Sequence, residues 1–166
     1  GSSFRTSEAI LHALGAKILP CHHHPSGINI NLDCGCTHPA VIESLVKATG
    51  AHVGVSHDGD ADRVLLSDEN GSVLDGDELM AIAAVSMIKA GTLKDNTLVA
   101  TIMSNAGLDE AISTVGGKVV RTGVGDRYVI AAMRAGGFNF GGEQSGHFIF
   151  HDFITTGDGI IAAVQL

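Results

Sequence analysis

The stretch that organises this chain is Ser56-His57-Asp58-Gly59-Asp60-Ala61-Asp62-Arg63. Its aspartates alternate with small residues, so in an extended or turning loop their side chains can point the same way and converge. Carboxylates held close together repel one another unless a cation lies between them. Carboxylate oxygens are hard ligands that suit Mg²⁺ or Ca²⁺ rather than zinc or copper. We therefore interpret Asp58, Asp60 and Asp62 as metal ligands, with a solvated acidic turn as the alternative.

Apolar residues flank this loop on both sides. Residues 53–55 (Val-Gly-Val) precede it and residues 64–66 (Val-Leu-Leu) follow it. This pattern predicts a strand, a loop and a second strand, with the aspartates at one edge of a sheet.

An EF-hand calcium loop is a second interpretation of the same stretch, because Glu69 supplies an acid at the twelfth position. The sixth position of an EF-hand needs glycine, however, and this chain has Arg63 there. The flanks also predict strands, whereas an EF-hand loop lies between helices. We therefore favour a metal loop of another kind.

The composition predicts one or two globular domains. The chain has 166 residues, of which 45% are hydrophobic and 17% charged, so it can bury a core and is not disordered. A net charge of −8 argues against a nucleic-acid-binding surface. No apolar run approaches the roughly 20 residues that span a bilayer. The odd number of cysteines, without disulfide spacing, predicts a reduced, cytoplasmic protein.

Periodicity and turn residues predict an alternation of helices and strands. The expected helices cover residues 7–14, 39–50, 78–90, 106–115, 128–135 and 160–164. The expected strands cover residues 17–20, 53–55, 64–67, 72–74, 97–102, 118–121 and 138–140. This rhythm predicts an α/β protein with two consecutive three-layer domains, residues 1–74 and 75–166, each with a mixed, mostly parallel sheet. The chain begins with a predicted helix and no starting strand, so we also expect it to be a fragment of a longer protein.

Two glycine-rich loops carry further polar chemistry. Residues 123–127 (Gly-Val-Gly-Asp-Arg) precede a predicted helix, so their backbone N–H groups suit an anion, although a plain turn is an alternative. Residues 141–147 expose Glu, Gln, Ser and His between glycines, which suits a ligand rich in hydroxyl groups. A polar hairpin turn is the alternative for this second loop.

Zinc ligands are the less favoured interpretation of two other groups. Residues 22–24 are adjacent histidines that point in different directions, so we favour an ordinary polar loop. Cys34 and Cys36 lie near His38, but this spacing is not that of a standard zinc site, so we favour buried or half-buried thiols.

Four motifs together resemble the α-D-phosphohexomutases, and among them the bacterial phosphoglucosamine mutases. They are residues 58–63 (DGDADR), 122–129 (TGVGDRYV), 142–147 (GEQSGH) and 151–159 (HDFITTGDG). The first and third fit several mutases of this superfamily, whereas VGDRYV and TTGDG favour the glucosamine branch. Their order and spacing also match, and the resemblance covers nearly the whole chain.

The resemblance implies a position within a larger enzyme. The family has four domains around a central cleft, and this chain resembles most of the second and third, which share an α/β fold. The phosphoserine of the first domain lies in a Ser-His-Asn-Pro type loop that these residues do not contain. The fourth domain, which grips the substrate phosphate, is the other missing partner, and a homodimer stays open as an assembly.

The resemblance also implies a reaction, the interconversion of glucosamine 6-phosphate and glucosamine 1-phosphate on the route to UDP-N-acetylglucosamine. A phosphoserine gives its phosphoryl group to the sugar, and the bisphosphate turns over before the other phosphate returns to the serine. The family's Mg²⁺ site maps onto Asp58, Asp60 and Asp62, and Arg63 is the catalytic residue that contacts a phosphoryl oxygen. The expected phosphosugar-binding residues are Asp126, Arg127, Glu143, Ser145 and His147.

Three alternatives remain at this point. A phosphomannomutase or phosphoglucomutase of the same superfamily would act on another sugar. A non-catalytic metal-binding module would bind the ion and no phosphosugar, and a structural fragment would bind neither.

Overall fold

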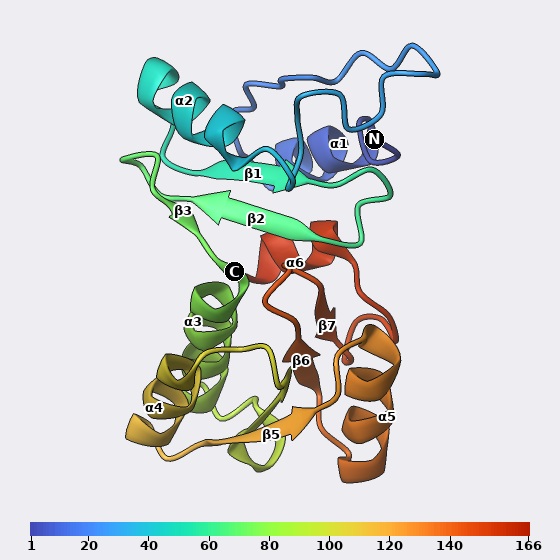
Figure 1. The fold of residues 1–166 in the computed structure, drawn as a ribbon. Coiled ribbons are helices and arrows are strands. Elements are labelled where there is room, and N and C mark those ends of the chain that lie inside the picture. Colours follow the sequence, from blue (N-terminus) through green and yellow to red (C-terminus); the bar gives the residue numbers. More distant parts are fainter.

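The computed structural model describes residues 1–166, which form two β-sheets with helices packed around them (Figure 1). The first part contains α1 (Thr6–Ala13), α2 (Pro39–Thr49), β1 (Gly54–His57), β2 (Val64–Ser67) and β3 (Val73–Leu74). The second contains α3 (Gly76–Lys89), the 3-10 helix η1 (Lys94–Asn96), β4 (Thr97–Thr101), α4 (Ala106–Thr114), β5 (Lys118–Thr122), α5 (Asp126–Gly136), β6 (Phe140–Gly142), β7 (Phe148–Phe150) and α6 (Gly159–Gln165). The expected α/β class is confirmed.

The first sheet has the strand order β1-β2-β3, and both of its pairs are antiparallel, so the expectation of a mostly parallel sheet is wrong for residues 1–74. The loops 58–63 and 68–72 are too short for the crossover that a parallel pair needs. Helix α2 begins with proline at its first turn, ends at Gly50 in the left-handed region, and buries Ile42 and Val46 against the sheet. The loop 58–63 is therefore the connection at the closed end of the β1–β2 hairpin, at one edge of the sheet.

The strand predicted over residues 17–20 is wrong. This segment is irregular, Leu19 is 57% exposed, and none of its backbone groups forms a hydrogen bond within the chain. A strand needs a neighbour for its N–H and C=O groups, and β1 pairs only with β2. The apolar run Lys17-Ile18-Leu19-Pro20 therefore does not suffice to form one here.

The second sheet has the order β5-β4-β6-β7, with parallel pairs except between β6 and β7. All of β4 is buried, as expected of a strand with both faces covered. Leu98 and Ala100 pack with α3 and α4, whereas Val99 packs with Val129 and Met133 of α5 on the opposite face. The second sheet is thus the middle of three layers. Strand β7 was not predicted: its three residues are all apolar and buried, so they show no alternation of polar and apolar side chains.

A capping box sets the start of α3, where the chain passes from the first sheet to the second. The Glu78 N–H donates to Asp75 Oδ1 at 2.9 Å, and the Asp75 N–H donates to Glu78 Oε2 at 2.8 Å. These bonds satisfy N–H groups at a helix N-terminus, where no intrahelical partner exists. The residues at the junction of the two sheets therefore also form the N-terminal cap of α3.

One hydrophobic core extends across both sheets. Val64 and Leu66 of β2 belong to the same buried cluster as Met80 of α3, Phe148 of β7 and Ala162 of α6. Figure 1 shows α6 between the two sheets, where it packs against β2 and β7. None of the helices combines the length and the apolar character needed to cross a bilayer.

Candidate functional site

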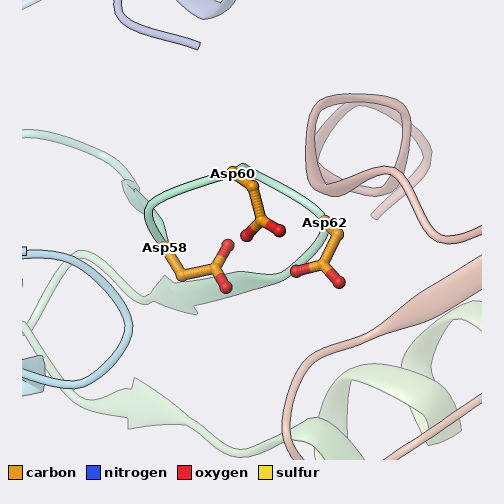
Figure 2. Close-up of side chains that lie close together, drawn as sticks. All are labelled: Asp58, Asp60 and Asp62. Carbon is orange, nitrogen blue, oxygen red and sulfur yellow. The ribbon is translucent and has the colours of Figure 1, made fainter. Parts of the chain in front are cut away.

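The acidic loop brings its three aspartates together at the end of β1. One carboxylate oxygen from each of Asp58, Asp60 and Asp62 lies within 4.8 Å of the others, and Figure 2 shows the three side chains turned toward a common point. Asp58 is buried, Asp62 is half-buried and Asp60 is exposed. Ala61 has a positive φ of 64°, which lets the loop turn between the second and third aspartates. The predicted convergence is therefore present in the geometry.

Arg63 neutralises part of this negative charge. Its Nε donates to Asp58 Oδ2 at 2.7 Å, and its backbone N–H donates to Asp58 Oδ1 at 3.3 Å. Burial raises the pKa of Asp58, but the hydrogen bond and the charge of Arg63 outweigh it and hold the pKa below its ordinary value. For Asp62, burial and the neighbouring charge of Asp58 raise the pKa. The loop thus holds carboxylates in two electrostatically different environments.

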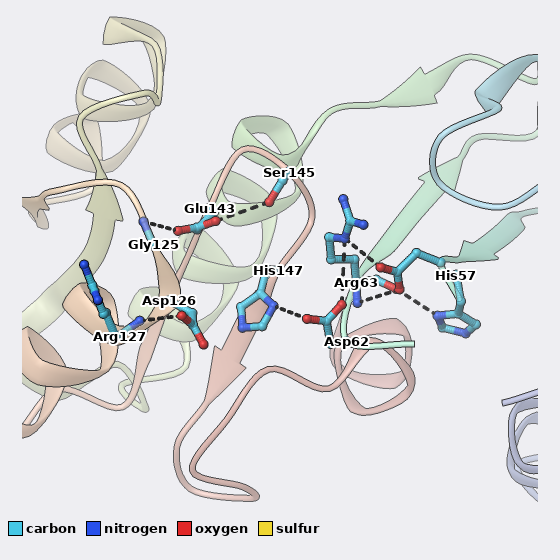
Figure 3. Close-up of polar contacts among 10 residues, drawn as sticks. His57, Asp62, Arg63, Gly125, Asp126, Arg127, Glu143, Ser145 and His147 are labelled. Carbon is cyan, nitrogen blue, oxygen red and sulfur yellow. Dashed lines mark hydrogen bonds and ion pairs between the residues drawn. The ribbon is translucent and has the colours of Figure 1, made fainter. Parts of the chain in front are cut away.

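Asp62 is also joined to the second sheet. Its Oδ2 lies 3.1 Å from Nδ1 of His147, which immediately precedes β7 (Figure 3). Around this contact Arg63 and His147 form an isolated β-bridge, and the Val64 N–H donates to the Gly146 carbonyl at 3.0 Å. The loop 143–147 therefore lies directly against the acidic loop, although the two are far apart in sequence.

Glu143 lines the same cavity as the acidic loop, and two hydrogen bonds hold its carboxylate there. The Gly125 N–H donates to Glu143 Oε1 at 2.8 Å, and Ser145 Oγ donates to Glu143 Oε2 at 3.4 Å (Figure 3). Gly125 is the N-cap of α5 and has a φ of 122°, which an L side chain would rarely adopt. The two glycine-rich loops, which the sequence treats as separate features, therefore form one polar wall.

A cavity of about 450 Å³ joins the acidic loop to that wall. Its lining consists of Asp58, Asp60, Asp62, Arg63, Gly125, Asp126, Glu143, Ser145 and His147. Of the residues expected to bind substrate or metal, only Arg127 is missing from this lining; its side chain lies over the Tyr128 ring and donates to Tyr128 Oη at 2.7 Å. Gly125 is the one lining residue outside the expected binding set; its backbone N–H, in the loop expected to suit an anion, donates to the carboxylate of Glu143.

The structure also decides between the metal alternatives. Strands β1 and β2 flank the acidic loop, which excludes an EF-hand. The histidines and cysteines do not gather into a metal-binding group. Cys36 is instead a half-buried thiol that donates to the Ser56 carbonyl at 3.1 Å, and burial raises its pKa to about 11.

Comparison with known protein families identifies the second half of the chain. Residues 75–166 match the phosphoglucomutase/phosphomannomutase alpha/beta/alpha domain III. A solved phosphoglucomutase/phosphomannomutase family protein from Burkholderia thailandensis superposes with a TM-score of 0.88 at 22% identity, over 99% of this chain and 36% of that one. An Aspergillus fumigatus N-acetylphosphoglucosamine mutase, solved with GlcNAc-6P and magnesium, superposes with a TM-score of 0.58 at 23% identity, over 81% of this chain and 34% of its own. These likenesses establish the fold.

Curated relatives match the entire chain at higher identity. A phosphoglucosamine mutase of Geobacter sp. (strain M21) is 54% identical over all 166 residues, and one of Caulobacter vibrioides is 51% identical over the same length. In both cases this chain spans 37% of the relative's length. The matched domain, the superposed folds and these relatives agree with one another: the chain belongs to the phosphoglucomutase/phosphomannomutase family.

Proposed function

We propose that this chain forms the metal-binding and sugar-binding part of a phosphoglucosamine mutase, which interconverts glucosamine 6-phosphate and glucosamine 1-phosphate. The observation that carries the proposal is one cavity whose lining includes both the acidic loop 58–63 and the polar wall formed by the two glycine-rich loops. Phosphoryl transfer depends mainly on positioning and on neutralising charge, and this cavity offers both kinds of group. The relatives that match the whole chain are named phosphoglucosamine mutases, which favours glucosamine over mannose or glucose.

In this proposal Asp58, Asp60 and Asp62 hold Mg²⁺. The donors fit, because all three are carboxylate oxygens and their spacing leaves them near enough to share one ion. Burial, and then the charge of Asp58, raises the pKa of Asp62, and a cation between these carboxylates would relieve their mutual repulsion. Bound there, Mg²⁺ would supply positive charge to stabilise a phosphoryl group in transfer.

Arg63 is the proposed phosphoryl-binding residue. Its Nε is used by Asp58, whereas its terminal nitrogens donate no hydrogen bond within the chain and its side chain lines the cavity. A guanidinium fixed at one edge can present its remaining N–H groups to phosphoryl oxygens in a planar fork. In this proposal Asp58 therefore has two roles: it is a metal ligand, and it orients Arg63 by accepting a hydrogen bond from its Nε.

Glu143 and Ser145 are the proposed sugar-binding residues, with Asp126 beside them in the lining. The Gly125 N–H fixes one oxygen of Glu143, which leaves the carboxylate oriented to accept from sugar hydroxyls. Ser145 is exposed and can both donate and accept. Contacts made through hydroxyls rather than phosphate suit a sugar that must bind in two orientations.

Glu143→Ala should weaken phosphosugar binding by roughly tenfold or more in a full-length mutase that carries these residues, because hydrogen bonds to a charged group are lost. Affinity for Mg²⁺ should not change, since Glu143 is not one of the clustered aspartates. Calorimetric titration with each ligand measures both. Glu110→Ala is the matched control, because Glu110 is an exposed glutamate on α4 away from the cavity. Lost metal binding with intact sugar binding would reverse the assignment of the two loops.

The 166-residue chain alone should show no mutase activity. It contains no Ser-His-Asn-Pro type loop, so no phosphoserine is present to donate a phosphoryl group and covalent catalysis cannot begin. The assay supplies glucosamine 6-phosphate, Mg²⁺ and a sugar bisphosphate, and follows glucosamine 1-phosphate. Turnover in a preparation free of host mutase would place the nucleophile inside these residues. Full-length enzyme, offered glucose and mannose phosphates in parallel, tests the choice of sugar.

We also place the protein in the cytoplasm. Its three cysteines are free, as expected in a reducing compartment.

A further inference from the structure

The turn between β7 and α6 has no role in the proposed reaction, yet it lies against the acidic loop. Its last residues are Gly157 and Asp158, and Gly159 begins α6; these three residues, from the TTGDG motif, make the turn into the helix. Asp158 caps α6: its Oδ1 accepts from the Ile160 N–H at 2.8 Å and from the Ile161 N–H at 2.9 Å. Helix α6 packs between the two sheets, so the turn is anchored to the core.

Gly159 holds the backbone of the acidic loop. Its N–H donates to the Ala61 carbonyl at 2.9 Å, at the residue whose positive φ turns the loop. A Cβ on Gly159 would lie 2.9 Å from that same oxygen and would overlap the Arg63 carbonyl. Only glycine therefore allows the turn to approach closely enough to form this bond.

Gly157 holds the ring of His147. A Cβ on Gly157 would overlap the imidazole, and His147 is only 7% exposed. Nδ1 of the ring faces Asp62 at 3.1 Å, where an ionised carboxylate accepts a hydrogen bond from a protonated Nδ1, and Nε2 is buried without a hydrogen-bond partner. The ring is thus packed between Gly157 and Asp62, which fixes its direction.

We propose that Gly157-Asp158-Gly159 is a positioning turn for the metal site: Gly159 fixes the loop backbone at Ala61, and Gly157, through His147, fixes the carboxylate of Asp62. The inference rests on the proposed metal role of the aspartates. Hydrogen bonds to ligating carboxylates set the orientation of those ligands, and losing such a partner typically lowers metal affinity by about 10- to 100-fold. The turn therefore prepares the loop before any ion enters.

Gly157→Ala in the 166-residue chain tests this proposal, with Mn²⁺ as the probe because it favours the same carboxylate ligands and broadens NMR signals nearby. Amide NMR spectra should place the broadening at residues 58–63. We expect Gly157→Ala to lower Mn²⁺ affinity about tenfold and, without metal, to shift the amide signals of the same loop. Gly107→Ala is the matched control: a Cβ there would meet only the Asn105 side chain, on a helix away from the cavity.

A second variant separates positioning from general damage. In His147→Asn the ring is gone, while the asparagine amide can still donate to Asp62. Adding Gly157→Ala to this background should change Mn²⁺ affinity by less than about twofold, because the two residues act through one contact and their effects are then non-additive. If Gly157→Ala does not fold alone, the double variant should recover the fold.

The outcomes distinguish the proposals. Equal Mn²⁺ affinity in the native chain and Gly157→Ala overturns the positioning role alone, as does an equal loss in both backgrounds or failure of the double variant to recover the fold. Absence of Mn²⁺ broadening at residues 58–63 in the native chain overturns the metal assignment itself.

Discussion

Asp60→Asn should lower the turnover of a full-length mutase containing these residues by about 100-fold or more, since removing one charge-stabilising group from a catalytic site has effects of that order. Asp60 is one of the clustered carboxylates and is exposed toward the cavity. Its loss weakens the proposed hold on Mg²⁺, and with it the positive charge available during transfer. Steady-state kinetics at increasing Mg²⁺ should show a raised metal requirement.

The same substitution should not destabilise the metal-free protein. The charge of Asp60 contributes to the raised pKa of Asp62, so Asp60→Asn removes a repulsion from the folded state. Glu69→Gln is the matched control: Glu69 lies in the exposed turn after β2, at the position that an EF-hand would have needed. Unchanged turnover and metal dependence in Asp60→Asn would contradict the metal assignment.

Phe148→Ala should destabilise the chain by about 3–5 kcal/mol, the range observed when a buried phenylalanine is truncated. Phe148 is 1% exposed and belongs to the cluster that contains residues of both sheets. Because that cluster is continuous, the two sheets should unfold together, and the lost stability should appear as a shift of one cooperative unfolding transition. Denaturant titrations followed by far-UV circular dichroism measure it.

Phe153→Ala is the control for this experiment. Phe153 is 61% exposed in the loop after β7, so its truncation should change the free energy of unfolding by no more than about 0.5 kcal/mol. Two separate transitions in the native chain, with Phe148→Ala shifting only one, would show that the sheets unfold independently.

Local patterns predicted much of the fold and of the candidate site. The alternating aspartates between apolar flanks predicted a strand, a loop and a strand, and the structure has β1 and β2 there. The helix expected from residue 39 begins at Pro39 in the structure, whereas the helix expected from residue 78 begins two residues earlier, at Gly76. These features depend on residues that are close in sequence, so a short stretch of the sequence is enough to predict them.

The missed features depend on residues that are distant in sequence. Residues 17–20 have strand-like composition but no adjacent strand, and the pairing partner cannot be known from the segment alone. The bond from the Gly159 N–H to the Ala61 carbonyl involves no side chain and joins residues far apart in sequence, so the sequence did not predict it. Arg127 was expected in the cleft for its charge, whereas the structure places its side chain on Tyr128.

The core that α6 shares with β2 has a consequence for recombination between related genes. The chain passes from one sheet to the other only once, at Asp75, which by strand order alone is the simplest place to exchange halves between homologues. Yet Ala162 and Val64 belong to one buried cluster, and Gly146 and Gly159 form hydrogen bonds with residues 61–64. A crossover at residue 75 would therefore pair residues 61–64 of one parent with residues 146–162 of the other, although these contacts evolved within separate proteins. Chimaeras should tolerate junctions outside residues 61–162 better than junctions within them, and this span should be inherited as a unit.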